Sequence, residues 1–192
     1  MEPFSARRVD RSLPCFYFLP QESSWLDYHY AYTSRAGGST ANFVAGKLVV
    51  CNIGSCDIYD QGVLTHVVKT ESYRQYASSA QSEDRVLLIG GWGQNTTEWI
   101  PLDGSMSQPG PFEVPIETHG GGWHCTIQVS YDVIVVTGGS DGPMESLNYV
   151  TEYHLTDATE TVMTPMNFKR SGHACGVYRE AGGQQVGIKI RF

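Results

Sequence analysis

Short apolar runs end in paired glycines at two places in the chain. Residues 85–89, RVLLI, are followed by Gly90 and Gly91, and residues 133–137, VIVVT, are followed by Gly138 and Gly139. Such runs, apolar, rich in β-branched residues and bounded by glycine, predict β-strands that are buried on both faces. Because glycine weakens a strand, its recurrence here indicates close approach of two backbones and a turn with positive φ.

The pattern repeats along the chain. Gly90 and Gly138 are 48 residues apart (138 − 90), and so are Tyr76 and His124 (124 − 76), each of which opens a short apolar stretch. His173 lies 49 residues beyond His124 (173 − 124), and residues 34–54 show the same order of parts. This period lies in the range of propeller blades and outside that of ankyrin, TPR or leucine-rich repeats. The sequence therefore predicts an all-β protein with four registers of one unit and almost no helix.

These residues resemble the kelch repeat of β-propellers. The likeness rests on the two diglycines, the openings RSGH and SRAGG, the tyrosine of VTEYHL and Trp25 of SWLDY, and it covers nearly the whole chain. It implies a partial kelch-type propeller with about three full four-stranded blades and two partial ones. Gly54 closes the first full blade in place of a diglycine. The implied ranges are a disordered segment at 1–14, the end of a partial blade at 15–34, blades at 35–70, 71–118 and 119–168, and the start of a truncated blade at 169–192.

Two arrangements of these blades remain open. In the first, which the sequence favours, the chain is an arc from a longer protein. A six- or seven-bladed ring with about 48 residues in each blade would need a longer chain than this one. In the second, residues 15–30 and the last strand complete one blade between them and close a small four-bladed ring.

Composition narrows the classes of partner. The 192 residues carry a formal net charge of −7 and no basic cluster larger than ARR or KR, which argues against nucleic acid. No apolar run approaches the roughly 20 residues of a membrane span, and MEPFSARRVDRSLP lacks the apolar core of a signal peptide. We therefore expect a soluble chain with no membrane insertion, in a compartment that the sequence leaves open.

The five cysteines form no zinc-binding pattern. Cys51 and Cys56 flank a predicted hairpin turn, where they form either a disulfide or, as the sequence favours, a pair of small buried apolar residues. Cys125 and Cys175 occupy neighbouring positions of successive first strands, so we expect their side chains to point to opposite faces. Asn95 begins the sequon Asn-Thr-Thr in a predicted exposed loop and is a candidate for N-glycosylation.

One face of the predicted propeller is rich in residues that suit recognition. In an antiparallel blade the loop between strands 2 and 3 lies on the same face as the link to the next blade, and loops on a rigid scaffold often carry binding residues. Trp, Tyr and Arg are the residue types that most often anchor interfaces. The candidate binding residues on this face are Arg35, Tyr73, Arg74, Trp92, Trp123, His124, Asp141, Arg170 and His173, with His119 beside them.

A purely structural role is the alternative for several of these residues. His124 and His173, like the arginines that open the blades, would then be buried and would bridge adjacent blades by hydrogen bonds. Trp92 would cap its own blade, and Trp25 and Trp99 are expected to pack in it. The resemblance implies that a protein or peptide partner binds on the face named above, so we expect a non-catalytic binding module.

A propeller-based enzyme is the alternative function. Residues 138–142, GGSDG, match the G-x-S-x-G elbow of serine hydrolases at Ser140, but that motif needs a helix directly after the serine, and Gly-Pro follows instead. Asp141 could serve with a histidine as an acid–base or metal set, but no ligand spacing supports it. A galactose-oxidase-like oxidoreductase shares the architecture only. We therefore expect no catalytic residues, no metal and no cofactor.

Overall fold

A computed structural model of the chain describes the backbone of residues 15–19, 24–28, 38–114, 122–141, 145–179 and 186–189. It describes the side chains of residues 38–114, 122–141 and 145–176. The chain divides into two compact units, residues 1–35 and residues 36–192. In the described residues every regular element is a strand, as the sequence predicts.

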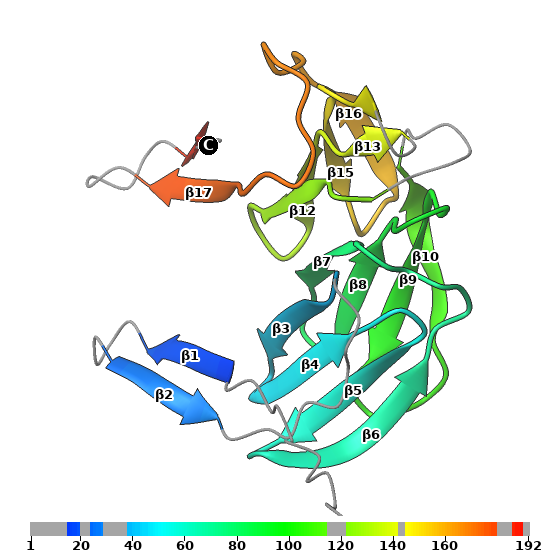
Figure 1. The fold of residues 1–192 in the computed structure, drawn as a ribbon, viewed down its shortest axis with the longest axis vertical. Helices are drawn as coiled ribbons and strands as arrows, with labels where there is room; N and C mark the ends of the chain where they lie inside the picture. Colours follow the sequence, from blue (N-terminus) through cyan, green and yellow to red (C-terminus); the bar gives the residue numbers. More distant parts are fainter. Residues whose placement is uncertain are drawn as a thin grey trace, which may run out of the picture. The chain divides into compact units, whose positions relative to one another are not determined.

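Residues 36–192 contain three four-stranded antiparallel sheets in which the strands lie side by side in chain order (Figure 1). Sheet 1 comprises β3 (Thr40–Val44), β4 (Lys47–Cys51), β5 (Ser55–Asp60) and β6 (Val63–Lys69). Sheet 2 comprises β7 (Ser78–Gln81), β8 (Arg85–Ile89), β9 (Thr96–Pro101) and β10 (Gln108–Glu113). Sheet 3 comprises β11 (Cys125–Gln128), β12 (Val133–Thr137), β15 (Val150–His154) and β16 (Thr159–Val162). Each sheet lies inside one of the three ranges given above for full blades.

Three two-stranded sheets complete the described structure. In the unit 1–35, β1 (Cys15–Leu19) pairs with β2 (Ser24–Tyr28). Between β12 and β15, the short strands β13 (Ser140–Asp141) and β14 (Glu145–Ser146) form a small hairpin. After sheet 3, β17 (Gly176–Arg179) pairs with β18 (Val186–Lys189).

Sheet 2 is buried on both faces, which explains its continuous apolar run. On β8, Val86 and Leu88 pack with Val49 and Ile58 of sheet 1. Leu87 and Ile89, whose side chains point the other way, pack against sheet 3 in a cluster completed by Trp99, Ile134, Val136 and Tyr153. Side chains on a strand alternate between the two faces, so only a strand covered on both sides is apolar at every position. Trp99 is therefore a packing residue, as predicted.

Backbone hydrogen bonds join the links that lead into successive sheets. The amide of Tyr76 donates to the carbonyl of Gly38 (3.1 Å), that of Trp123 to Tyr76 (3.1 Å), and that of Gly172 to Trp123 (2.8 Å). All four residues have positive φ, at 89°, 61°, 57° and 63° for Gly38, Tyr76, Trp123 and Gly172. Tyr76 is therefore equivalent to Trp123, whereas the sequence spacing had paired it with His124. The prediction was wrong by one residue, because it relied on residue type and could not see φ.

Candidate binding face

The loops between second and third strands lie against the links between sheets, as the predicted topology requires. The loop after β4 accepts a hydrogen bond from the link to sheet 2, from Arg74 N to Ile53 O (2.8 Å). The loop after β8 bonds to the same link, from Trp92 N to Gln75 O (2.6 Å). The loop after β12 bonds to the next link, from Ser140 N to Gly122 O (2.9 Å). We call this surface the loop face.

Arg74 is a structural residue and not a surface anchor, which corrects its assignment as a binding residue. Its side chain is 2% exposed and its Nε donates to Oε2 of Glu98, 2.6 Å away and fully buried. The guanidinium also donates to the carbonyl oxygens of Gly90 (3.0 Å) and Thr96 (2.7 Å). The second oxygen of Glu98 accepts the amide of Glu71 (2.7 Å). The pair is satisfied inside the protein, because a buried charge requires such partners.

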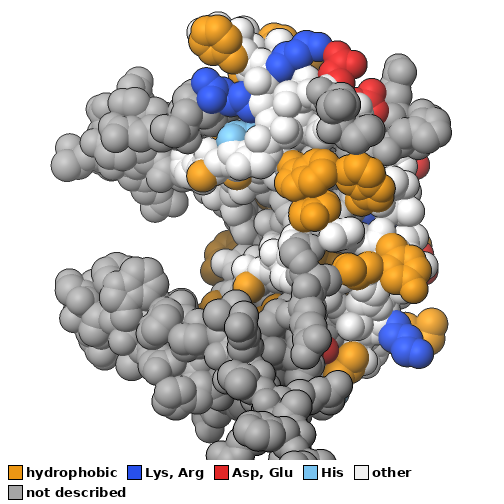
Figure 2. Space-filling view, viewed as in Figure 1, with side chains coloured by type: hydrophobic (Ala, Val, Ile, Leu, Met, Phe, Trp, Pro, Cys, Tyr) orange, Lys and Arg blue, Asp and Glu red, His pale blue; other side chains and the backbone are white. Residues whose placement is uncertain are grey.

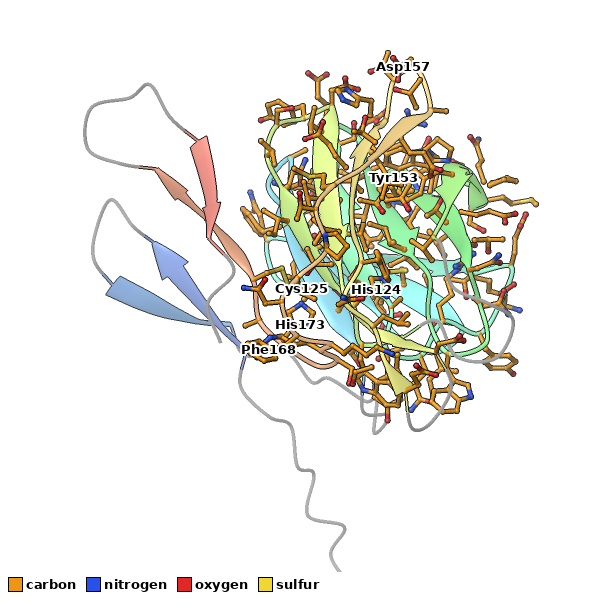
Figure 3. All side chains as sticks on the ribbon, turned by 90° about the horizontal axis from the view of Figure 1, so that it is seen from above. His124, Cys125, Tyr153, Asp157, Phe168 and His173 are labelled. Carbon is orange, nitrogen blue, oxygen red and sulfur yellow. A yellow bond between two sulfur atoms is a disulfide. The ribbon has the colours of Figure 1, made fainter. Side chains whose placement is uncertain are left out.

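His124 and His173 also bridge neighbouring elements, which is the structural role given above as the alternative. His124 is buried, and its Nε2 lies 2.9 Å from the carbonyl of Ile89, which can only accept, so Nε2 carries the proton. Burial lowers the pKa of His124 to about 4, and the pKa of His173 is lowered too, again chiefly by burial. Nε2 of His173 lies 2.8 Å from the hydroxyl of Thr137. His124 is thus not available to a partner, and Figure 3 labels both rings beside sheet 3.

Three aromatic rings from different segments form a cluster on the loop face. Tyr76 stacks on Trp123 with ring centroids 4.3 Å apart and planes inclined by 26°. Trp92 meets Trp123 edge to face, with centroids 5.3 Å apart. Trp92 is 39% exposed, so the cluster reaches the surface. Tyr73 belongs to the same link as Tyr76 and is 74% exposed. We call Tyr73, Tyr76, Trp92 and Trp123 the aromatic group.

The other described candidates, Asp141 and Arg170, are placed by contacts of their own elements. Asp141 lies on β13, half-buried, opposite Glu145 of β14. Arg170 pairs by its backbone with Leu147, and its guanidinium lies 5.8 Å from the ring of Phe168. Arg35 and His119 lie outside the described residues, as does the side chain of Trp25.

The paired glycines lie where two backbones meet. Gly90, Gly91, Gly138 and Gly139 all have positive φ, at 59°, 121°, 57° and 106°. A Cβ at Gly91 would lie 2.8 Å from Cα of Arg74, and one at Gly139 would lie 3.0 Å from Cβ of His124. Gly54, whose φ is not in the left-handed region, would meet only the ring of Tyr73 at 3.6 Å, an ordinary contact. The two diglycines therefore allow the loop between the second and third strands of a sheet to pack directly against the neighbouring link.

Replacing Gly91 with alanine tests this close approach. Gly93, two residues on, also has positive φ (74°), but a methyl group placed there would have nothing within 4 Å, so Gly93→Ala carries a backbone cost without overpacking. Gly91→Ala adds the contact with Arg74 and a larger backbone cost, because its φ of 121° lies further from the left-handed minimum. We expect Gly91→Ala to lower the free energy of unfolding by about 2 kcal/mol more than Gly93→Ala, as at overpacked sites. Urea denaturation followed by tryptophan fluorescence measures the difference. Equal losses would show that the contact with Arg74 is not tight.

Two disulfides are found among the residues whose side chains the structure describes. Cys51 and Cys56, on β4 and β5, are joined, as in one of the two interpretations drawn from the sequence. Cys125 and Cys175 are joined as well, contrary to the expectation that they point apart. Cys125 begins β11 and Cys175 immediately precedes β17, so the segment that leads into β17 lies beside sheet 3.

Asn95, the candidate for N-glycosylation, is half-buried, and its side-chain amide donates to Glu113 (3.0 Å).

Neither of the chemical alternatives drawn from the sequence finds its geometry in the described residues. Ser140 is buried on strand β13, where its hydroxyl donates to the carbonyl of Glu145 (3.2 Å), so it does not stand exposed on a strand-to-helix turn. No group of three or more His, Cys, Asp or Glu in the described part of the chain is placed to hold a metal ion. In Figure 2 the Lys and Arg side chains stand beside acidic and hydrophobic ones and form no continuous basic field. Within the same residues, no helix is long and apolar enough to span a membrane.

Two residues that shape this face were not predicted as site residues. Glu98 is the partner of Arg74, and its signal in the sequence is a lone acid within the otherwise apolar stretch TEWIP. Tyr76 was identified as a repeat landmark but not as part of a site. Only the backbone conformation shows that Tyr76 occupies the repeat position that glycine occupies at Gly38 and Gly172.

Comparison with known proteins supports the fold and goes no further. No protein-family model matches the chain, and no curated protein matches it either. Among solved structures, the chain is similar to YjhT, a propeller-type protein, with a TM-score of 0.69 and 11% sequence identity. The similarity covers 80% of this chain and 60% of YjhT, so the chain spans less than two thirds of that structure. At this identity the likeness shows an all-β, propeller-like arrangement of four-stranded sheets.

Proposed function

We propose that the chain is a non-catalytic binding module that recognises a protein or peptide through the aromatic group on the loop face. We further propose that its three sheets are blades of the kelch type. Two diglycines, each seated on a neighbouring link, and the chain of hydrogen bonds through Gly38, Tyr76, Trp123 and Gly172 support a repeated blade.

The observation that carries the binding proposal is the positive φ of Tyr76 and Trp123. The left-handed conformation costs a residue with a Cβ about 1–2 kcal/mol, and glycine avoids that cost at the equivalent positions 38 and 172. Strained residues of this kind cluster at functional sites. The strain here holds two large rings in contact with Trp92, on a face built from loops.

The chemistry of the aromatic group suits a peptide. Tyr and Trp offer wide apolar faces with few rotatable bonds, so they lose little side-chain entropy when they bind a partner. Arg74, the charge nearest to these rings in the chain, is neutralised by Glu98 and does not face solvent. A short segment with apolar or aromatic side chains is therefore the favoured ligand.

Panning a random peptide library on the whole chain tests the proposal. Selected peptides should bind the unaltered protein and lose at least about tenfold in affinity with Trp92→Ala, because anchor tryptophans often contribute about 2 kcal/mol or more. Trp123→Gly and Tyr76→Gly should lose a similar factor, and the relief of backbone strain at both positions offsets part of the ring packing that is lost.

Tyr131→Ala is the matched control for these variants. Tyr131 is 70% exposed in the turn between β11 and β12, at the opposite end of the strands from the loop face. Its removal should leave peptide binding unchanged. Peptides that bind Trp92→Ala, Trp123→Gly and Tyr76→Gly as well as they bind the unaltered chain would show that the binding site lies elsewhere.

A further inference from the structure

One contact between first strands recurs in every pair of neighbouring sheets. We number positions from the positive-φ residue of each link, which is Gly38, Tyr76, Trp123 or Gly172. Thr40, at position +2, forms a hydrogen bond of 2.5 Å with Ser79, at position +3 of the next register. Ser78, again at +2, forms one with Thr126, at +3. A hydroxyl pair thus joins sheet 1 to sheet 2 and sheet 2 to sheet 3 at the same position.

The Cys125–Cys175 disulfide takes the same position in the next interval. Cys125 is at +2 from Trp123, and Cys175 is at +3 from Gly172. The segment that begins β17 therefore lies beside β11 as β11 lies beside β7. Here a covalent bond stands where the other two intervals have a pair of hydroxyl groups.

We propose that the Cys125–Cys175 disulfide is a redox-sensitive clasp that holds the β17–β18 hairpin against sheet 3. The hairpin has only two strands, and isolated two-stranded hairpins are marginally stable in water. On this face of sheet 3, Cys175 packs against a cluster of three buried residues, Ile127, Val135 and Val150.

The segment that precedes Cys175 is held by hydrogen bonds that do not depend on the disulfide. The amide of Gly139 donates to Arg170 (2.8 Å) and that of Gly172 to Trp123 (2.8 Å), so residues up to 172 are anchored to the loop face. Cys175 lies three residues further on, at the start of the hairpin. Opening the disulfide should therefore release β17 and β18 and leave the preceding segment in place.

The two disulfides differ in access, which makes the clasp selective. Cys51 and Cys56 are 3% and 0% exposed, whereas Cys125 and Cys175 are only half-buried. Thiolate attack requires access to a sulfur atom. A dithiol reductant gives up two electrons and two protons and becomes a disulfide itself. The Cys125–Cys175 bond breaks, and each of these cysteines becomes a thiol.

Graded reduction of the whole chain tests the proposal. Free thiols, including any at Cys15, are first blocked with one alkylating reagent. Dithiothreitol is then added in steps, and new thiols are labelled with a second reagent and located by mass spectrometry. We expect Cys125 and Cys175 to be labelled at dithiothreitol concentrations at least tenfold below those that open Cys51–Cys56. At those concentrations, hydrogen exchange in β17 and β18 should rise at least tenfold, while exchange in β4 and β5 stays unchanged.

Paired variants separate a clasp from a general stabilising role. Cys125→Ser with Cys175→Thr recreates the hydroxyl pair of Ser78 and Thr126, and should fold with fast exchange in β17 and β18 that reductant no longer changes. Cys51→Ser with Cys56→Ser should keep slow exchange in the hairpin until reductant is added. The proposal is overturned if Cys51–Cys56 opens first, or if reduction of Cys125–Cys175 in the unaltered chain leaves exchange in β17 and β18 as it was. These readouts are independent of any peptide binding.

Discussion

Replacing Arg74 with alanine is expected to lower the free energy of unfolding by about 3–5 kcal/mol, the range for breaking a buried ion pair from one side. The loss is large because Glu98 would remain fully buried with its charge uncompensated, and because the carbonyl oxygens of Gly90 and Thr96 would lose their donor. Chemical denaturation followed by circular dichroism measures it.

Two further variants show that burial is the cause. Lys169 and Glu145 are also 2.6 Å apart, but both side chains are exposed and screened by solvent, so Lys169→Ala should be far less destabilising than Arg74→Ala. Replacing both partners, as Arg74→Met with Glu98→Leu, should recover much of the loss because no charge is then left unpaired. If Arg74→Ala is no more destabilising than Lys169→Ala, the ion pair does not hold the link to sheet 2.

Acidification is expected to destabilise the protein by about 3 kcal/mol through His124 alone, of which about 2 kcal/mol is lost by pH 5. Burial lowers the pKa of His124 to about 4 in the folded state, from 6.5 for an ordinary histidine. The folded chain therefore favours the neutral ring. Its contribution is complete above pH 6.5 and is lost as the pH falls toward 4, because the unfolded chain takes up the proton first. His173, whose pKa is also lowered, acts in the same direction.

Denaturation curves at pH 7.5, 6.0 and 5.0 measure this dependence. Glutamine cannot take up a proton in this range and keeps a donor for the carbonyl of Ile89, so His124→Gln should flatten most of the slope. A slope that persists in His124→Gln would assign the pH dependence to other groups.

The predicted binding residues near the loop face fall into two groups, one that stabilises the fold and one that is exposed to a partner. Arg74 and His124 hold the sheets together from inside, whereas Trp92 and Tyr73 reach solvent. A choice of variants by residue type alone would mix the two groups. Binding variants are therefore best made at the aromatic group, where substitution to alanine or glycine leaves the buried ion pair and histidines untouched.

The sequence by itself determined the strands and their grouping. RVLLI and VIVVT are apolar at nearly every position, and this pattern suits only strands covered on both faces, as β8 and β12 are. The diglycines also predicted close approach of two backbones, because a position that needs positive φ and room for a second backbone favours glycine. These features are local, so the order of residues along the chain is enough to encode them.

Only the tertiary structure decided which residues face solvent and which face another sheet. Cys125 and Cys175 are 50 residues apart, and only the packing of the segment before β17 beside β11 brings them together, which strand alternation along the chain could not show. The pairing of Arg74 with Glu98 and the equivalence of Tyr76 with Trp123 depend likewise on contacts between sheets and on φ. Residue type fixes what a side chain can do, but its partner is set by the packing of segments distant in the chain.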